Sequence, residues 1–385
     1  MAFWRRRAVV DAPPSWEEFF PLEAFLRGHV DEVLAIERRQ VWGRAMAFGG
    51  RLRVDPGRAL EHLRARLQPR GYTPFLREEG GLAWIHALPQ AEVAAQPSPL
   101  VNVALFAATV LTTLLAGTLL LGGVSPAELW LRPSRILVGL PFAASLLGIL
   151  GVHEFGHYTL GRRHGMAISL PYFIPVPPVP PFLLGTLGAL IRLRGPVRDR
   201  RALFDMAVAG PLAGLVVAVP IYMLGLSLSS VVRLPSGAAE GSGYVQFGDA
   251  VLPKLIEWVV LGAVPPDHDV LLHPVGVAAW FGFFVTALNL IPAGQLDGGH
   301  IVYALFGRQH ALISKLTVGA LVLVGIAFGS LNWVVWAVLI VALMGFQHSP
   351  TMDDITPLDP GRRALGLFAL LLLFLLIPPV PLSVR

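Results

Sequence analysis

Two histidines and a glutamate lie close together in one apolar stretch of the chain. The segment His153-Glu154-Phe155-Gly156-His157 has the pattern H-E-x-x-H, and residues 136–152 before it contain no charged side chain. On a helix, positions i and i+4 lie on one face, so both imidazoles can bind one metal ion. Glu154 would then stand beside the metal, where a carboxylate can take a proton from metal-bound water.

The apolar surroundings weigh against a coincidental match. In a soluble protein the same five residues could simply form a solvated helix face. Ionisable side chains inside a membrane helix are costly, and they are usually functional. The pattern therefore indicates a metal site at membrane depth.

A third ligand is expected, because catalytic zinc usually has three protein ligands and one open position for water. Asp297 is the only other acidic residue in comparable apolar sequence, and it follows the apolar run 274–288. Residues that interrupt a helix surround it: Pro292, Gly294, Gly298 and Gly299. Asp297 alone could be a turn residue in an Asp-Gly pair. Together with the histidine helix, a metal ligand is the favoured interpretation.

The two motifs in combination resemble the site-2 protease family of intramembrane zinc metalloproteases. The H-E-x-x-H segment is followed far downstream by N-x-x-P-x-G-x-L-D-G-G, from Asn289 to Gly299. Segments 185–192, 204–205 and 209–214 resemble connecting segments of that family, so the likeness runs from about residue 135 to about residue 305. The chain looks like the branch that has a soluble N-terminal extension and no PDZ domain.

This resemblance implies a function and a set of site residues. His153, His157 and Asp297 would hold one zinc ion per chain, and Glu154 would act as the general base. Asn289 matches the family motif and would hydrogen-bond substrate or the oxyanion. The implied activity is that of an intramembrane zinc endopeptidase that cleaves transmembrane segments of membrane protein substrates. Its partners would be such a substrate and the lipid bilayer.

A proline-rich segment follows the histidine motif, with six prolines among residues 171–181. This density of proline excludes a helix, and the alternation in 189–194 predicts a short strand. The resemblance implies a membrane-associated β-hairpin whose edge strand holds an extended substrate through backbone hydrogen bonds. Gly185, Thr186 and Gly188 are the predicted substrate-binding residues. A surface loop is the alternative.

The composition predicts a mainly α, polytopic membrane helix bundle. The hydrophobic fraction is 54%, charged residues make up 14%, and the mean hydropathy is +0.63. The absence of cysteine excludes disulfides and thiolate ligands. The net charge of +5 does not indicate nucleic-acid binding, because the basic residues distribute by membrane side. About seven spans are expected, with six or eight as alternatives: 100–123, 136–160, 203–226, 274–296, 312–329, 331–346 and 364–382.

Three regions are expected: a soluble α+β domain over 1–98, a catalytic core over 99–305 and further membrane helices over 306–385. In the first region Asp55 is expected to cap a helix opened by Pro56, with strands at 72–77 and 82–88. A regulatory role and a merely stabilising one are both open for it. No apolar run follows its basic start, so it does not resemble a targeting peptide.

The arginines predict the orientation in a cell membrane. They are abundant before the first span and between the second and third, which places these parts in the cytoplasm. The loop 227–273 carries more acidic than basic residues, and it is expected outside.

Two other classes of membrane protein use similar ligands. A metal transporter would arrange several ligand clusters along a path, whereas only one is evident in the sequence. A non-haem iron oxygenase uses two histidines and one carboxylate, but it would leave Glu154 without a role.

Overall fold

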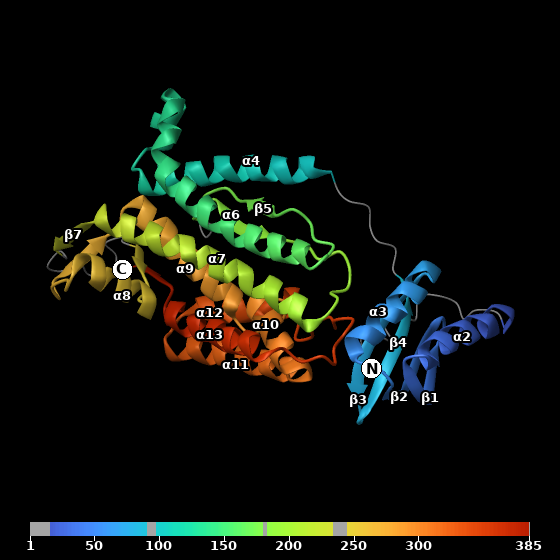
Figure 1. The fold of residues 1–385 in the computed structure, drawn as a ribbon. Coiled ribbons are helices and arrows are strands. Elements are labelled where there is room, and N and C mark those ends of the chain that lie inside the picture. Colours follow the sequence, from blue (N-terminus) through green and yellow to red (C-terminus); the bar gives the residue numbers. More distant parts are fainter. Residues whose placement is uncertain (1–15, 91–97, 180–182, 234–244, 385) are drawn as a thin grey trace. The chain divides into compact units, whose positions relative to one another are not determined.

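The computed structural model describes residues 16–90, 98–179, 183–233 and 245–384 (Figure 1). The chain divides into two compact units. The first comprises residues 1–95, 194–203 and 349–359, and the second comprises the remainder. The sequence does not predict that the two later segments join the first unit.

In its described residues, the first unit contains a four-stranded antiparallel sheet and the helices α2 and α3. Its elements are α2 (Trp16–Asp31), β1 (Leu34–Trp42), β2 (Ala45–Leu52), α3 (Pro56–Leu67), β3 (Tyr72–Glu79) and β4 (Leu82–Pro89), with strand order β1-β2-β4-β3. The predicted helix and the two predicted strands are present. The Asp55 carboxylate caps α3 by accepting a hydrogen bond from the backbone N–H of Gly57.

The two later segments extend this unit through backbone pairing. Leu76 of β3 donates to the carbonyl of Met352 (2.7 Å), and Met352 donates to the carbonyl of Val197 (2.8 Å). Asp354 is buried, and its carboxylate lies 3.0 Å from the guanidinium of Arg200. A carboxylate with this partner is satisfied although it lies away from water.

The second unit is mainly helical. Its helices are α4 (Pro99–Ala116), α5 (Pro126–Leu131), α6 (Leu140–Arg163), α7 (Arg200–Ser227, whose first residues lie in the first unit), α8 (Val251–Leu261), α9 (Pro274–Leu290), α10 (Asp297–Phe306), α11 (His310–Ala327), α12 (Leu331–Leu343) and α13 (Pro360–Leu376). A π-helical turn, Gly117–Leu121, extends α4, and a 3-10 turn, Pro133–Gly139, precedes α6.

Four helical segments among the described residues are long and apolar enough to cross a membrane. They are Pro99–Leu121, Pro133–Arg163, Arg200–Ser227 and Asp297–Ala327. Pro274–Leu290 and Leu331–Leu343 are shorter apolar helices, so the total of about seven spans stays a prediction. The helix interruption predicted near the end of the span 274–296 is present. α9 ends at Leu290, before Pro292 and Gly294, and the chain becomes helical again at Asp297.

The predicted β-hairpin is present, with a shifted strand. β5 (Tyr172–Pro175) pairs antiparallel with β6 (Thr186–Leu190), and β5 packs against α4. The strand predicted over 189–194 is displaced, because β6 ends at Leu190 and Leu193 instead forms an isolated bridge with Ile168. The described part of this unit also has two small sheets: β7 (Ser230–Arg233) with β9 (His268–Leu271), and β8 (Val245–Phe247) with β10 (Leu382–Val384).

Candidate metal centre

The structure brings the three predicted metal ligands together in the second unit. His153 and His157 lie one turn apart on α6, and Asp297 is the first residue of α10. The two Nε2 atoms are 3.1 Å apart, and Oδ2 of Asp297 lies 3.4 Å from Nε2 of His153 and 3.2 Å from Nε2 of His157. Both histidines are buried, as is fitting for a site inside an apolar helix bundle. One small cation could contact all three side chains.

The break between α9 and α10 places Asp297 at this point. A Cβ atom on Gly298 would lie 2.0 Å from the carbonyl oxygen of Leu290, and one on Gly299 would lie 2.5 Å from that of Gly294. Only glycine therefore allows the start of α10 to lie so close to the end of α9. The Asp-Gly-Gly sequence serves this close approach and directs the carboxylate toward α6.

A backbone carbonyl orients one histidine ring. His157 Nδ1 lies 2.7 Å from the carbonyl oxygen of Met206 on α7, to which it donates. This hydrogen bond leaves the lone pair of Nε2 available for a metal, which is the usual arrangement of a ligating histidine. The sequence gives no direct signal for Met206, because a backbone carbonyl does not depend on the residue type.

Glycines on α7 make room for both rings. A Cβ atom on Gly210 would lie 2.0 Å from Nε2 of His157, and one on Gly214 would lie 3.1 Å from Nδ1 of His153. On α6, a Cβ atom on Gly156 would lie 2.8 Å from the carbonyl oxygen of Ala209. Two glycines four residues apart on a helix usually serve close helix packing. In the structure the pair provides the space that the ligand rings occupy.

Glu154 and Asn289 lie beside the ligands without belonging to them. Glu154 is only 5% exposed, and it is not among the three residues whose atoms could share one ion. Asn289, in the last turn of α9, has its Nδ2 atom 3.2 Å from Nε2 of His153. The carboxylate and the amide can therefore act on a molecule bound at the metal while the ligand set stays intact.

The three predicted substrate-binding residues belong to the hairpin. A Cβ atom on Gly185 would lie 2.3 Å from the carbonyl oxygen of Thr112, and the Thr112 hydroxyl donates to Gly185 O (2.6 Å). The Thr186 hydroxyl donates to Ile174 O (2.9 Å) and accepts from the N–H of Gly188 (3.0 Å). The Gly185 contacts fix the hairpin to α4, and the Thr186 contacts fix its own shape. A substrate would therefore meet backbone groups rather than these side chains.

β6 has one edge paired with β5 and packs against α6, the helix that carries both histidines. The sheet has two strands in the described part of the chain, so the second edge of β6 has no strand beside it there. An unpaired edge is the usual docking place for an extended peptide.

Two polar residues near the motifs have other partners. The Asp205 carboxylate has an arginine partner far along the chain. This carboxylate binds Arg362 of α13 in a bidentate pair, with both distances 2.7 Å, and lies 2.9 Å from Nε2 of His164. His300 lies outside the metal-binding group, as the sequence predicts, with its Nδ1 2.6 Å from Nε2 of His348.

Comparisons with known proteins agree with this geometry. Residues 141–331 match the model of peptidase family M50. The chain is 31% identical over 265 residues to "Probable zinc metalloprotease EGY1, chloroplastic" of Arabidopsis thaliana. This alignment covers 67% of the chain and 46% of that protein. It is 32% identical over 250 residues to "Probable zinc metalloprotease EGY2, chloroplastic" of the same species, covering 63% and 42%. No solved structure matches significantly.

The chain spans less than half the length of these curated relatives, with shares of 46% and 42%. The matched segment contains both predicted metal-binding motifs and the hairpin, while the N-terminal sheet lies outside it. The long apolar helices, taken with this family, make the chain a membrane protein. The resemblance inferred from the two motifs is thereby confirmed, and residues 141–331 belong to peptidase family M50, the site-2 protease family.

Proposed function

We propose that this chain is an intramembrane zinc endopeptidase that cleaves transmembrane segments of other membrane proteins. The observation that carries the proposal is the meeting of His153, His157 and Asp297 at one point, with Glu154 beside them. Relatives of the chain are named zinc metalloproteases, which supports both the metal and the reaction class.

The donor set fits zinc. Two imidazole nitrogens and one carboxylate oxygen are a known catalytic zinc set that leaves a position for water. The hydrogen bond from His157 to Met206 O and the glycine space around both rings hold the donors in place. When bound, zinc would lower the pKa of its water and polarise the scissile carbonyl.

Glu154 is proposed as the general base and then the general acid. It neighbours His153 in the chain and is buried, so its carboxylate can take a proton from the attacking water and pass it to the leaving amine. Asn289 is proposed to donate a hydrogen bond to substrate, because its side chain reaches Nε2 of His153 and so lies next to the reacting position.

A helical substrate hides its scissile carbonyl in an i to i+4 hydrogen bond. The substrate must therefore unwind locally, and glycine or small polar residues near the cut would ease this. The second edge of β6 is the proposed place where the unwound strand is held, through backbone hydrogen bonds. Gly185, Thr186 and Gly188 would maintain the shape of this edge.

The test uses purified full-length chain and a transmembrane peptide with glycines near its centre. Glu154→Gln should retain zinc and fold but lose about 10²- to 10⁴-fold in cleavage rate, the usual contribution of general acid–base catalysis. The matched control is Glu128→Gln, which alters a partly exposed glutamate paired with Arg135. Near-normal cleavage by Glu154→Gln would refute the mechanism. A wild type that transports metal, or that holds iron and oxidises lipid, instead of cleaving the peptide would refute the function.

A further inference from the structure

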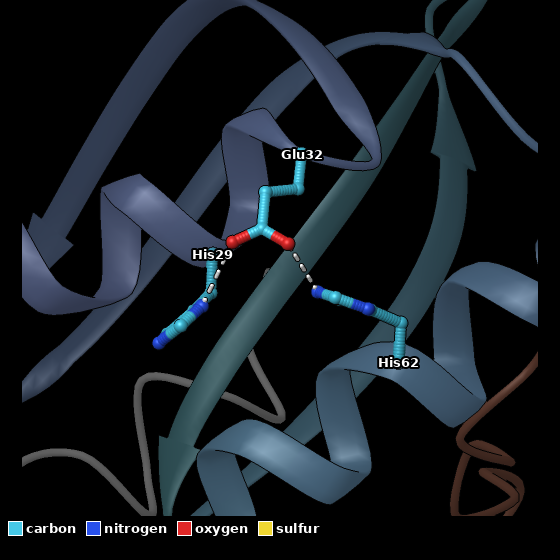
Figure 2. A group of neighbouring side chains, drawn as sticks. All are labelled: His29, Glu32 and His62. Atoms are coloured by element: carbon cyan, nitrogen blue, oxygen red, sulfur yellow. Dashed lines mark hydrogen bonds and ion pairs between the residues drawn. The ribbon is translucent and has the colours of Figure 1, made fainter.

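A second group of metal-ligating side chains lies in the first unit (Figure 2). His29 lies in the last turn of α2, Glu32 lies in the turn before β1, and His62 lies in α3. Nδ1 of His29 is 3.1 Å from Oε1 of Glu32, and Nε2 of His62 is 2.9 Å from Oε2 of Glu32. Figure 2 shows both rings directed at the one carboxylate from opposite sides.

The donor set is the same as that of the first metal centre. It consists of two imidazole nitrogens and one carboxylate oxygen, and one atom from each residue lies within 4.8 Å of the other two. Atoms that bind zinc lie about 2.0–2.2 Å from the ion, so the three donor atoms need to move only slightly closer together to bind it. Nε2 of His62 is shielded from solvent, and its contact in this group is the Glu32 carboxylate, 2.9 Å away. A metal ion held between this nitrogen and the carboxylate would satisfy both groups.

The surroundings hold the donors while leaving access from solvent. Phe25 packs its ring edge-to-face against His29, with centroids 4.8 Å apart. His62 lies on α3, whose start is fixed by the Asp55 cap. The Glu32 side chain is 51% exposed, so an ion can enter and a water molecule can complete its coordination.

We propose that His29, Glu32 and His62 form a second zinc site in the N-terminal unit. Because it would join the end of α2 to the middle of α3, bound zinc would stabilise the packing of these two helices. The site is distinct from the proposed catalytic centre and implies two zinc ions per chain, where the family resemblance implies one. Its ligands lie outside residues 141–331, the segment that matches the peptidase family.

The test counts metal in the full chain by mass spectrometry after loading with zinc and removal of free ion. Wild type should hold two zinc ions per chain. His153→Ala/His157→Ala should hold one, His29→Ala/His62→Ala should hold one, and the combination of all four changes should hold none. The same count in wild type and His29→Ala/His62→Ala would overturn the proposal, whatever the count in wild type. The count does not depend on proteolysis, so its failure is distinct from failure of the proposed function.

Two controls guard against indirect effects. His268→Ala removes a histidine whose Nδ1 lies 2.8 Å from Asp267, in a pair that belongs to neither possible metal-binding group of the described residues. This change should leave the zinc count unchanged. Glu32→Gln keeps the size of the side chain but weakens the donor, and it should reduce the count by one. If His268→Ala also loses one zinc, the loss is nonspecific and the proposal fails.

A second measurement reports on the fold. In His153→Ala/His157→Ala protein, zinc should slow amide hydrogen exchange in α2 and α3. This protection should vanish when His29→Ala and His62→Ala are added. Protection by zinc that survives these two changes would contradict the site.

Discussion

A Cβ atom on Gly210 would lie 2.0 Å from Nε2 of His157, the nitrogen that faces Asp297. α7 thus shapes the metal centre without contributing a ligand side chain. The same helix accepts the hydrogen bond from His157 Nδ1 at the carbonyl of Met206. Both the space for the ring and its orientation therefore depend on α7.

Gly210→Ala should displace the His157 ring and lower zinc affinity. We expect a loss of about 10- to 100-fold, the range for changes that disturb ligand orientation, with a parallel loss of cleavage. Gly214→Ala should cost less, because its Cβ would lie 3.1 Å from His153, where a small shift relieves the contact. Competition with a chelator measures the affinity. The control is Gly148→Ala on α6, where an added Cβ meets nothing within 4 Å. Equal affinities for Gly210→Ala and Gly148→Ala would refute this account.

Asp297→Asn should lower zinc affinity by more than the Gly210 change, because it removes the only negative ligand while it keeps the shape. His153 and His157 would still provide two neutral donors, so weak binding should persist. The measurement is zinc content after dialysis against a weak chelator. The control is Asp269→Ala, which removes an acidic side chain from β9. Full occupancy in Asp297→Asn would remove Asp297 from the ligand set.

The motifs could be predicted from sequence because they depend on residue type and local spacing. The i, i+4 histidines require only a helix, and the helix breakers around Asp297 indicate an irregular segment at the right depth. The helix capped by Asp55 and the strands joined at Gly80-Gly81 likewise follow from local signals.

Long-range pairing could not be predicted in this way. Asp205 pairs with Arg362, which lies 157 residues away, instead of a nearby arginine. Segments 194–203 and 349–359 join the N-terminal unit through backbone hydrogen bonds, which any sequence can form. The role of Gly210 also becomes evident only when α6 and α7 are placed side by side, because small residues at helical spacing serve packing in general.

The N-terminal unit should lose stability in mild acid because of His86 on β4. Burial, together with the nearby charge of Arg77, lowers the pKa of His86 from 6.5 to about 4. His86 in the unfolded chain therefore binds a proton near pH 6.5, whereas His86 in the folded unit binds it only near pH 4. The stability of the folded unit therefore falls as pH falls across this window. The loss of unfolding free energy that this pKa difference can cause is at most about 3 kcal/mol. His86→Phe should flatten this dependence in hydrogen exchange corrected for its intrinsic rate. An unchanged pH profile would exclude His86 as the cause.

The charge asymmetry predicts the orientation of the chain in a cell membrane. The chain has no native cysteine, so single cysteines report their side without background. A cysteine at Ala263, in the acidic loop, should react with an impermeant reagent added outside. One at Arg51, an exposed residue of β2, should react only after permeabilisation. The reverse labelling pattern would mean that the chain lies in the membrane with the opposite orientation.

The second edge of β6 offers the sharpest test of substrate binding. Leu187 is 59% exposed and falls at the irregular point of the hairpin, between the pairs Pro175 with Thr186 and Phe173 with Ala189. Leu187→Pro removes one backbone donor of β6 without replacing any residue of those pairs.

Cleavage by Leu187→Pro should therefore fall, by about tenfold for a lost hydrogen bond of about 1.4 kcal/mol. Zinc content and thermal stability should stay near those of the unaltered chain. Leu187→Ala is the matched control, because it removes the same side chain and keeps the N–H, so it should cleave nearly as well as the unaltered chain. If both variants lose cleavage equally, the Leu187 side chain is what matters. If neither loses it, substrate is held elsewhere, most simply at Asn289 beside the ligands.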